Sequence, residues 1–228
     1  LPSPPGVIRA AVDRSALWAG RAKVAQARAR ARVEGSGQAQ FGIVQGGIDV
    51  ALRTESAERT LEIGFDGYGI GGLSVGETRE EMLPALAATT EVLPADHPRY
   101  LMGVGDPVSI VEAVALGVDM FDCVLPTRLA RHGTILTSQG RLNLRNARFA
   151  RDPEPLDPGC ACPTCQRWSR AYLKHLLAVS EPTGARLTTI HNVHWLLRLI
   201  DDVRQAIGEG SYASLRQRVA DIWDEPVT

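Results

Sequence analysis

Four short apolar strands with helices between them occupy the first 124 residues, and this alternation limits the folds open to the chain. The strands are expected at residues 41–45, 67–72, 100–104 and 120–124, and the helices at 50–63, 79–92 and 107–116. Gly64 and Gly117 suit helix ends, and Pro107 suits a first helical turn. The alternation predicts an α/β fold with a parallel sheet and crossover helices. Half of a (β/α)₈ barrel and a doubly wound sheet both satisfy it.

Polar side chains and bare backbone fall where these strands end. Gln45 with Gly46, Gly71 with Gly72, and Asp122 are the residues concerned. Both architectures bind their ligands at the carboxyl edge of the sheet. We therefore expect a binding site at this edge.

Other segments complete the expected organisation. Residues 1–6 are rich in proline and should be extended, whereas residues 9–33 should form a helix that Gly35 closes. Beyond the fourth strand, residues 133–144 predict a β-hairpin, followed by helices at 166–179 and 193–207 and a surface helix within the tail 209–228.

Overall composition gives little sign of a nucleic-acid partner, because the net charge is −1. Six arginines without any acidic residue nevertheless lie between Arg128 and Arg151. This cluster could neutralise several phosphates or could be a solvated basic face. The chain contains no apolar run long enough to span a bilayer, and its first ten residues lack the apolar run of a secretory signal. It also lacks an initiator Met, so we expect a fragment or a processed chain.

Three of the four cysteines lie in the segment Cys160-Ala-Cys162-Pro-Thr-Cys165. Residues so close cannot all pair in unstrained disulfides, and the usage fits a reducing, cytoplasmic compartment. Three thiolates and one imidazole are a common ligand set for structural zinc. We expect His191, which a preceding turn would bring across, to be the fourth ligand, with His175 and His194 as competitors.

Asp122 ends a strand that is otherwise apolar. Such a carboxylate is either an anchor for hydrogen bonds or a functional group, and a carboxylate can attack the anomeric carbon of a sugar. The glycines at 46–47 and 69–72 permit close approach to the backbone, although tight turns would also explain them. A phosphate cradle is disfavoured because no Gly-Lys-Ser/Thr follows, whereas Gln45 offers a donor and an acceptor to a base edge.

Six segments resemble, in order and in spacing, the successive signatures of tRNA-guanine transglycosylases. They are Phe41–Gly47, Gly67–Glu77, Arg99–Gly105, Asp119–Arg128, Pro155–Cys165 and Thr189–Asn192. The resemblance spans residues 17–210. It implies the C-terminal half of a (β/α)₈ TIM barrel with an inserted zinc subdomain, whose ligands are Cys160, Cys162, Cys165 and His191. The expected divisions are a half-barrel at 1–131, the hairpin and zinc subdomain at 132–191, and returning helices at 192–228.

The resemblance also implies a reaction, in which the wobble guanine of tRNA is exchanged for 7-aminomethyl-7-deazaguanine during queuosine biosynthesis. Asp122 would attack the ribose and form a covalent intermediate. Glu77 would orient the backbone of residues 73–75, and Val75 resembles the bacterial form. The expected contacts with the base are Gln45, the Gly72 N–H, the Leu73 carbonyl, Met102 and Tyr100. The expected contacts with tRNA are Arg128 and Arg131.

The resemblance further implies the tRNAs for Asp, Asn, His and Tyr as partners, and a homodimer. An acid/base Asp and a base-binding Asp of the family have no counterpart here, and Asp13 is no substitute. We therefore expect the isolated chain to be inactive or very weakly active. The alternatives are a non-catalytic, zinc-containing RNA-binding or partner subunit, and an unrelated zinc-ribbon module.

Overall fold

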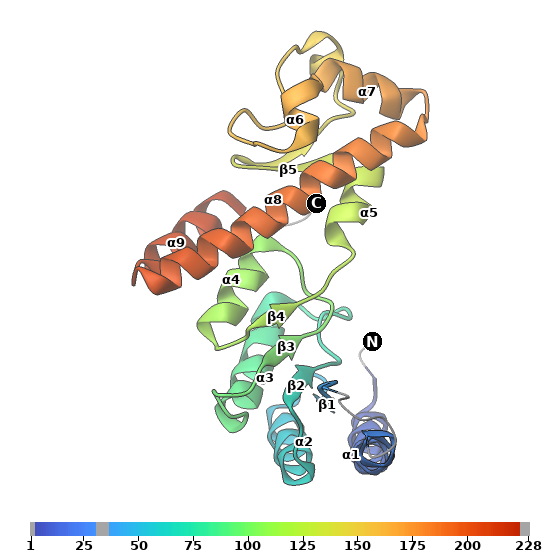
Figure 1. The fold of residues 1–228 in the computed structure, drawn as a ribbon, viewed down its shortest axis with the longest axis vertical. Coiled ribbons are helices and arrows are strands. Elements are labelled where there is room, and N and C mark those ends of the chain that lie inside the picture. The colour runs from blue at the N-terminus through green and yellow to red at the C-terminus, as the bar shows by residue number, and fades with distance from the viewer. Residues whose placement is uncertain (1–2, 31–36, 224–228) are drawn as a thin grey trace. The chain divides into compact units, whose positions relative to one another are not determined.

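The computed structural model describes residues 3–30 and 37–223 of the chain (Figure 1). These residues form two compact units. The first comprises residues 1–104 with 112–123, and the second comprises residues 105–111 with 124–228. This division assigns the helix that follows residue 124 to the second unit, whereas the sequence had suggested a boundary at residue 131. No helix among the described residues is long and apolar enough to cross a membrane.

A four-stranded parallel sheet forms the centre of the first unit (Figure 1). Its strands are β1 (Phe41–Val44), β2 (Gly67–Ile70), β3 (Arg99–Leu101) and β4 (Met120–Phe121). They pair in chain order, β1-β2-β3-β4, and every pairing is parallel. A doubly wound sheet contains a reversal of strand order, and these described strands contain none. All four expected strands are thus confirmed, although each ends earlier than predicted.

Helices connect the strands at the positions that the sequence indicates. They are α2 (Val50–Ile63), α3 (Arg79–Val92) and α4 (Pro107–Ala115). Asp49 caps α2 by accepting a hydrogen bond from the Leu52 N–H, and Gly64 ends it with φ 77°. Thr78 and Glu81 form a reciprocal capping box at the start of α3. Local capping chemistry therefore fixes both helices at their predicted bounds.

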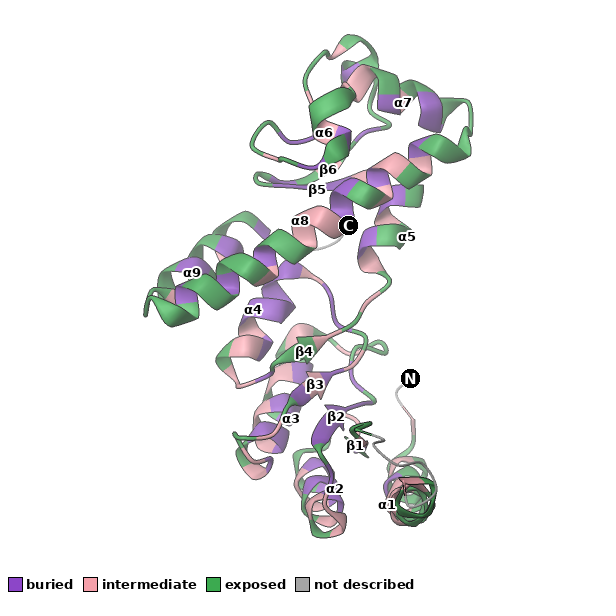
Figure 2. Ribbon diagram, in the orientation of Figure 1, coloured by how far each residue is buried: buried purple, intermediate pink, exposed green. Residues whose placement is uncertain are grey.

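The core of the first unit lies between the sheet and these helices. Strand β2 is buried along its whole length (Figure 2). Ile70 and Leu101 from the strands and Leu86 from α3 are fully buried there. Burying side chains of this size stabilises a fold by about 1.5–3 kcal/mol each. The sheet is therefore held mainly by apolar packing, which leaves the polar residues at its carboxyl edge free for other roles.

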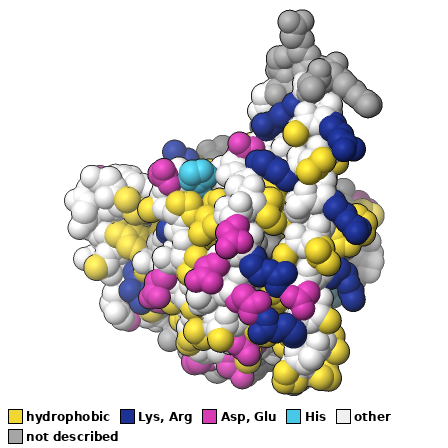
Figure 3. Space-filling view, turned by 90° about the horizontal axis from the view of Figure 1, so that it is seen from below, with side chains coloured by type: hydrophobic (Ala, Val, Ile, Leu, Met, Phe, Trp, Pro, Cys, Tyr) yellow, Lys and Arg dark blue, Asp and Glu magenta, His cyan; other side chains and the backbone are white. Residues whose placement is uncertain are grey.

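Helix α1 (Pro5–Arg30) precedes the sheet, and it begins earlier than expected. Pro5 and Gly6 belong to its first turn, where proline is tolerated because the N–H that it lacks has no helical partner there. The predicted end near residue 33 and the Gly35 stop lie outside the described residues. Figure 3 shows basic and apolar side chains alternating along this helix. Leu17, Trp18 and Val24 are among the exposed apolar ones.

The second unit begins with α5 (Leu125–Arg131), which the sequence did not predict. The expected fourth strand stops at Phe121 because Pro126, in the first turn of α5, starts a helix instead. The expected hairpin is confirmed as β5 (Thr134–Thr137) paired antiparallel with β6 (Gly140–Asn143). A short 3₁₀ helix, η1 (Ala147–Arg151), follows.

Two predicted helices of this unit differ from the structure. The helix expected at 166–179 is divided into α6 (Pro163–Arg167) and α7 (Arg170–Ala178), because Ser169 leaves the helix and caps α7 through the Tyr172 N–H. The helix expected at 193–207 is much longer and runs as α8 (Pro182–Gly208). It crosses the expected boundary between residues 191 and 192.

A second apolar core joins the hairpin to these helices. Ile135, Leu144, Leu156 and Leu173 are fully buried in it. The expected tail helix is α9 (Tyr212–Trp223), which buries Leu215, Val219 and Trp223 and so is not merely a surface element.

Candidate functional site

Asp122 directly follows β4, and its side chain is exposed to solvent. Its Oδ1 accepts two hydrogen bonds, one of 2.6 Å from the Tyr100 hydroxyl and one of 2.8 Å from the Gly103 N–H. Tyr100 lies on β3 and Gly103 follows that strand, so the adjacent strand supplies both donors. The carboxylate is therefore fixed through one oxygen.

Both donors favour the ionised form of Asp122. The hydrogen bond from Tyr100, followed by the bond from Gly103, lowers the pKa of the Asp122 carboxyl below its usual value. The same contact raises the pKa of Tyr100, which remains a hydrogen-bond donor. An ionised, exposed and oriented carboxylate has the properties that a nucleophile needs.

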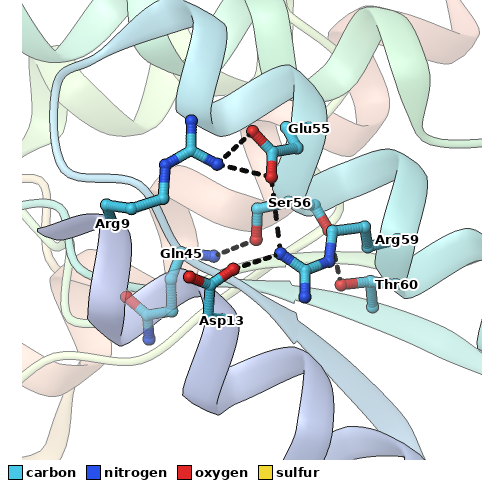
Figure 4. Close-up of polar contacts among 7 residues, drawn as sticks. All are labelled: Arg9, Asp13, Gln45, Glu55, Ser56, Arg59 and Thr60. Atoms are coloured by element: carbon cyan, nitrogen blue, oxygen red, sulfur yellow. Dashed lines mark hydrogen bonds and ion pairs between the residues drawn. The ribbon is translucent and has the colours of Figure 1, made fainter.

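Gln45 follows β1, and its position is fixed from both sides. Its backbone N–H donates to Ser56 Oγ over 3.0 Å, a contact drawn in Figure 4 beside the ion pairs that join α1 to α2. Its side chain lies against the backbone after β2. A methyl group built on Gly71 would lie 3.0 Å from Gln45 Nε2, and one built on Gly72 would collide with Gln45 Oε1. These glycines are thus explained by close approach of a side chain to the backbone.

Met102 reaches the same glycine segment from the neighbouring strand. Its sulfur lies 3.5 Å from a methyl group built on Gly71 and 3.6 Å from one built on Gly69. The structure therefore brings Gln45 and Met102 together around Gly71. Leu73, which comes next in the chain, is buried.

The segment after Gly72 turns sharply and is held by an acidic side chain. Gly72 has φ 67° and Ser74 has φ 58°, a conformation that is uncommon for a residue other than glycine. Glu77 accepts hydrogen bonds from the backbone N–H groups of Ser74 and Val75, the latter over 3.0 Å. The expected orientation of the 73–75 backbone by Glu77 has a direct counterpart in these two bonds.

One residue of this region was missed by the sequence reasoning. Arg53 lies inside α2 and its side chain is fully buried. Its guanidinium donates to the carbonyl oxygens of Gly47, Gly71 and Gly72 over 2.7, 2.8 and 3.2 Å. Burial lowers the pKa of Arg53 to about 10, which leaves the side chain charged at neutral pH. Only its position, one turn after the cap of α2, could have suggested that it faces the sheet.

A separate cluster of ligands lies in the second unit. The side-chain ligand atoms of Cys160, Cys162, Cys165 and His191 all lie within 4.8 Å of one another. His191 Nδ1 is 3.6, 3.5 and 3.2 Å from the three sulfur atoms in that order. Sulfur and nitrogen ligands of a tetrahedral zinc ion are separated by about 3.5 Å. The four residues can therefore hold a metal ion.

The surroundings of His191 prepare it to bind a metal through Nδ1. It lies within α8, which begins at Pro182, so the expected turn before His191 is helix instead, and the residue is fully buried. Its Nε2 lies 2.8 Å from the Leu136 carbonyl, which assigns the ring proton to Nε2 and leaves a lone pair on Nδ1. Burial lowers the pKa of His191, so the ring is neutral. This arrangement fits a metal ligand and selects His191 over the competing histidines.

The six arginines of the 128–151 segment are all exposed. Arg128 and Arg131 lie in the last turn of α5, where positive charge is favourable. Other members make internal contacts, since Arg145 Nε donates to the His132 carbonyl over 3.0 Å and Arg148 lies 4.6 Å above the Phe149 ring. Some of these exposed arginines thus also make contacts within the chain.

Known proteins resemble this chain over most of its length. Residues 2–225 match the family described as queuine tRNA-ribosyltransferase. The chain is 50% identical over 215 residues to the queuine tRNA-ribosyltransferase of Halothermothrix orenii, covering 94% of this chain and 56% of that protein. Its identity to the Lysinibacillus sphaericus protein of the same name is also 50%, covering 90% and 52% respectively. The chain spans about half the length of these relatives. It belongs to the queuine tRNA-ribosyltransferase family.

Proposed function

We propose that this chain supplies the nucleophile and part of the base-binding site of a tRNA-guanine transglycosylase. The observation that carries the proposal is Asp122, an exposed carboxylate whose hydrogen bonds from Tyr100 and Gly103 keep it ionised. Family membership supplies the reaction class, a pentosyl transfer. The proposed substrates are the wobble guanine of the tRNAs for Asp, Asn, His and Tyr and the base 7-aminomethyl-7-deazaguanine.

The proposed reaction has two displacements at one carbon. An oxygen of Asp122 attacks ribose C1′, the bond from C1′ to the base nitrogen breaks, and guanine departs with that electron pair and takes up a proton. The nitrogen of the incoming base then attacks C1′, releases the Asp122 carboxylate and loses a proton. A carboxylate nucleophile divides one difficult exchange into two easier steps. The base must leave its stack to reach the nucleophile, at an unstacking cost of a few kcal/mol.

We assign base binding to the glycine segment beside Asp122. Gln45 and the Gly72 N–H would bond the base edge, the Leu73 carbonyl would meet the substituent at position 7, and Met102 would cover one face. The contacts of Gln45 and Met102 around Gly71 support this assignment, as does the position of Tyr100 on Asp122. Glu77, which holds the Ser74 and Val75 N–H groups, would keep the segment in shape.

We further propose that the first unit is half of a (β/α)₈ barrel. The strand order without a reversal supports this, because neighbouring strands of such a barrel follow one another in the chain. Among the described strands, β1 and β4 each pair on one side only, and Leu17 and Trp18 on α1 are exposed, so the remaining half would pack against these surfaces. The proposed divisions remain residues 1–131, 132–191 and 192–228, with the second forming a zinc subdomain.

Zinc is the metal proposed for the Cys160, Cys162, Cys165 and His191 cluster, because three thiolates and an imidazole suit it. Four protein ligands close the coordination shell, so the ion would stabilise the subdomain and leave the chemistry to Asp122. Arg128 and Arg131 would contact tRNA phosphates.

A homodimer in the cytoplasm is the proposed state of the protein. The stacked Trp168 and Tyr172 rings, 4.7 Å apart and both exposed, support a protein contact near the zinc subdomain.

The test is the capture of a covalent intermediate. The chain is incubated with guanosine-wobble tRNA and the deazaguanine, alone and together with the N-terminal half of the Halothermothrix orenii relative that it does not cover. A denaturation-resistant RNA adduct that forms in the presence of the added half and is lost in Asp122→Asn is the expected result. Asp119→Asn is the matched control, since Asp119 accepts a hydrogen bond from the Arg99 N–H and lies just before β4.

RNA binding without an adduct under both conditions would overturn the enzyme assignment. It would favour a non-catalytic partner subunit, for which the zinc cluster and the exposed arginines would suffice.

A further inference from the structure

We propose that Arg53 is a positioning residue for base binding, because it fixes and polarises the peptide group between Gly71 and Gly72. This inference rests on the proposed function, in which the Gly72 N–H bonds the base. Arg53 touches neither the substrate nor Asp122 in this proposal. It acts through the backbone.

The geometry around Arg53 differs from that of an ordinary buried arginine. Its side chain is fully buried, and the four oxygens that it bonds are all backbone carbonyls. Two of these, on Val44 and Gly47, lie at the end of β1 and just after it, and two, on Gly71 and Gly72, lie directly after β2. One planar guanidinium therefore links the two chain segments that carry Gln45 and Gly72.

The bond to the Gly71 carbonyl has a consequence for the next residue. That carbonyl and the Gly72 N–H are the two ends of one peptide group. Arg53 Nη1 donates to the carbonyl over 2.8 Å, which draws electron density toward the oxygen and makes the N–H a stronger donor. The same bond fixes the plane of the peptide and hence the direction of the N–H.

Arg53 and Glu77 both hold the backbone of residues 71–75, one as a hydrogen-bond donor and the other as an acceptor. Arg53 donates hydrogen bonds to the carbonyls of Gly71 and Gly72, whereas Glu77 accepts hydrogen bonds from the N–H groups of Ser74 and Val75. Neither side chain uses the Gly72 N–H or the Leu73 carbonyl, the two backbone groups assigned to the base. The arrangement holds the segment in the left-handed turn at Gly72 and leaves those groups for a ligand.

A lysine cannot replace this arginine. Its ammonium is a single point on a flexible stem, so it cannot hold the carbonyls of Gly47, Gly71 and Gly72 at once. We therefore expect Arg53→Lys to keep the charge and lose the positioning, and Arg53→Met to lose both. Arg59 supplies the matched control, because it lies on the same helix but pairs with Asp13 over 2.6 Å at the partly exposed junction with α1 (Figure 4).

Two measurements test the proposal. The first is amide hydrogen exchange of the peptide spanning residues 71–77 in the 228-residue chain. The second is the KM for guanine in the exchange assay with the added N-terminal half, with active sites counted by the RNA adduct. We expect Arg53→Lys to raise the amide exchange rate about tenfold and the KM for guanine about tenfold. Loss of one to two net hydrogen bonds implies changes of this size. Arg53→Met should raise the exchange rate and the KM further than Arg53→Lys does. Arg59→Met should leave both at the wild-type value.

A merely structural role would lower the number of active sites without moving the KM per site. Wild-type exchange and KM in a folded Arg53→Lys would therefore overturn the proposal. If Arg53→Met does not fold, the amide exchange and the KM of Arg53→Lys still test the proposal. Failure of the wild-type chain to transfer any base would overturn the proposed function instead, while the amide exchange of residues 71–77 would still test whether Arg53 orders the segment.

Discussion

Replacement of Asn192 by alanine should destabilise the second unit severely. Asn192 lies beside His191 on α8 and is fully buried. Its Oδ1 accepts from the Leu136 N–H over 3.0 Å, and its Nδ2 donates to the carbonyls of Pro126 and Thr134 over 3.1 and 3.0 Å. One amide thus joins α8 to both α5 and β5.

The magnitude follows from the three backbone groups that alanine would leave without a partner. A buried donor or acceptor left unsatisfied costs about 1–3 kcal/mol. Two of the three bonds are buried and the third is partly buried, so the loss should be about 3–6 kcal/mol. The whole stability of a domain is about 5–15 kcal/mol, and each kcal/mol shifts the melting temperature by about 2–4 °C.

The assay is thermal and urea-induced unfolding of the metal-loaded protein, followed by tryptophan fluorescence in a Trp18→Phe background, which leaves only the three tryptophans of the second unit. Asn143→Ala is the matched control, because Asn143 is exposed and bonds only locally to the Arg145 N–H. The control should lie within about 0.5 kcal/mol of the wild type. A loss below about 1 kcal/mol for Asn192→Ala would refute the reasoning that these three bonds hold α8 to the hairpin.

Three further outcomes are expected. His191→Ala should lower bound zinc well below one ion per chain, measured by elemental analysis; a full complement of metal would contradict the ligand assignment. Tyr100→Phe should raise the pKa of Asp122 toward its usual value, because the hydrogen bond that lowers it is lost. Since the proposed nucleophile is the ionised form, adduct formation should then need a higher pH, and an unchanged acidic limb of the pH–rate profile would contradict this. Gly72→Ala should abolish base binding, because φ is 67° at this position and the new methyl group would collide with Gln45 Oε1. The measurement is the KM for guanine, and a wild-type KM would contradict this expectation.

The depressed pKa of Asp122 also has a consequence for stability. A carboxyl whose pKa is lower in the folded state contributes stability above its unfolded pKa, and this contribution is lost as the pH falls through the folded value. The contribution is small here because the side chain is exposed.

Local sequence signals determined much of the secondary structure. The helix at Val50–Ile63 begins and ends where an Asp cap and Gly64 predict, and the hairpin at 134–143 forms around its Ser-Gln-Gly turn. The close spacing of Cys160, Cys162 and Cys165 indicated a metal site because neighbouring thiols have few alternatives. These features depend on contacts within a few residues, which a sequence displays directly.

Tertiary structure decided what depends on distant residues. Nothing in the composition of α2 marks Arg53 as the residue that holds two strand ends, since its carbonyl partners come from turns that only the sheet brings together. Similarly, the sequence leaves Asp122 as either an anchor or a functional group, and only the sheet brings Tyr100, from the adjacent strand, to donate a hydrogen bond to it. His191 was separated from His175 and His194 only by the turn of α8 that directs it toward the cysteines. A charged side chain acquires its role from its neighbours in space, and the sheet, not the order of residues, provides them.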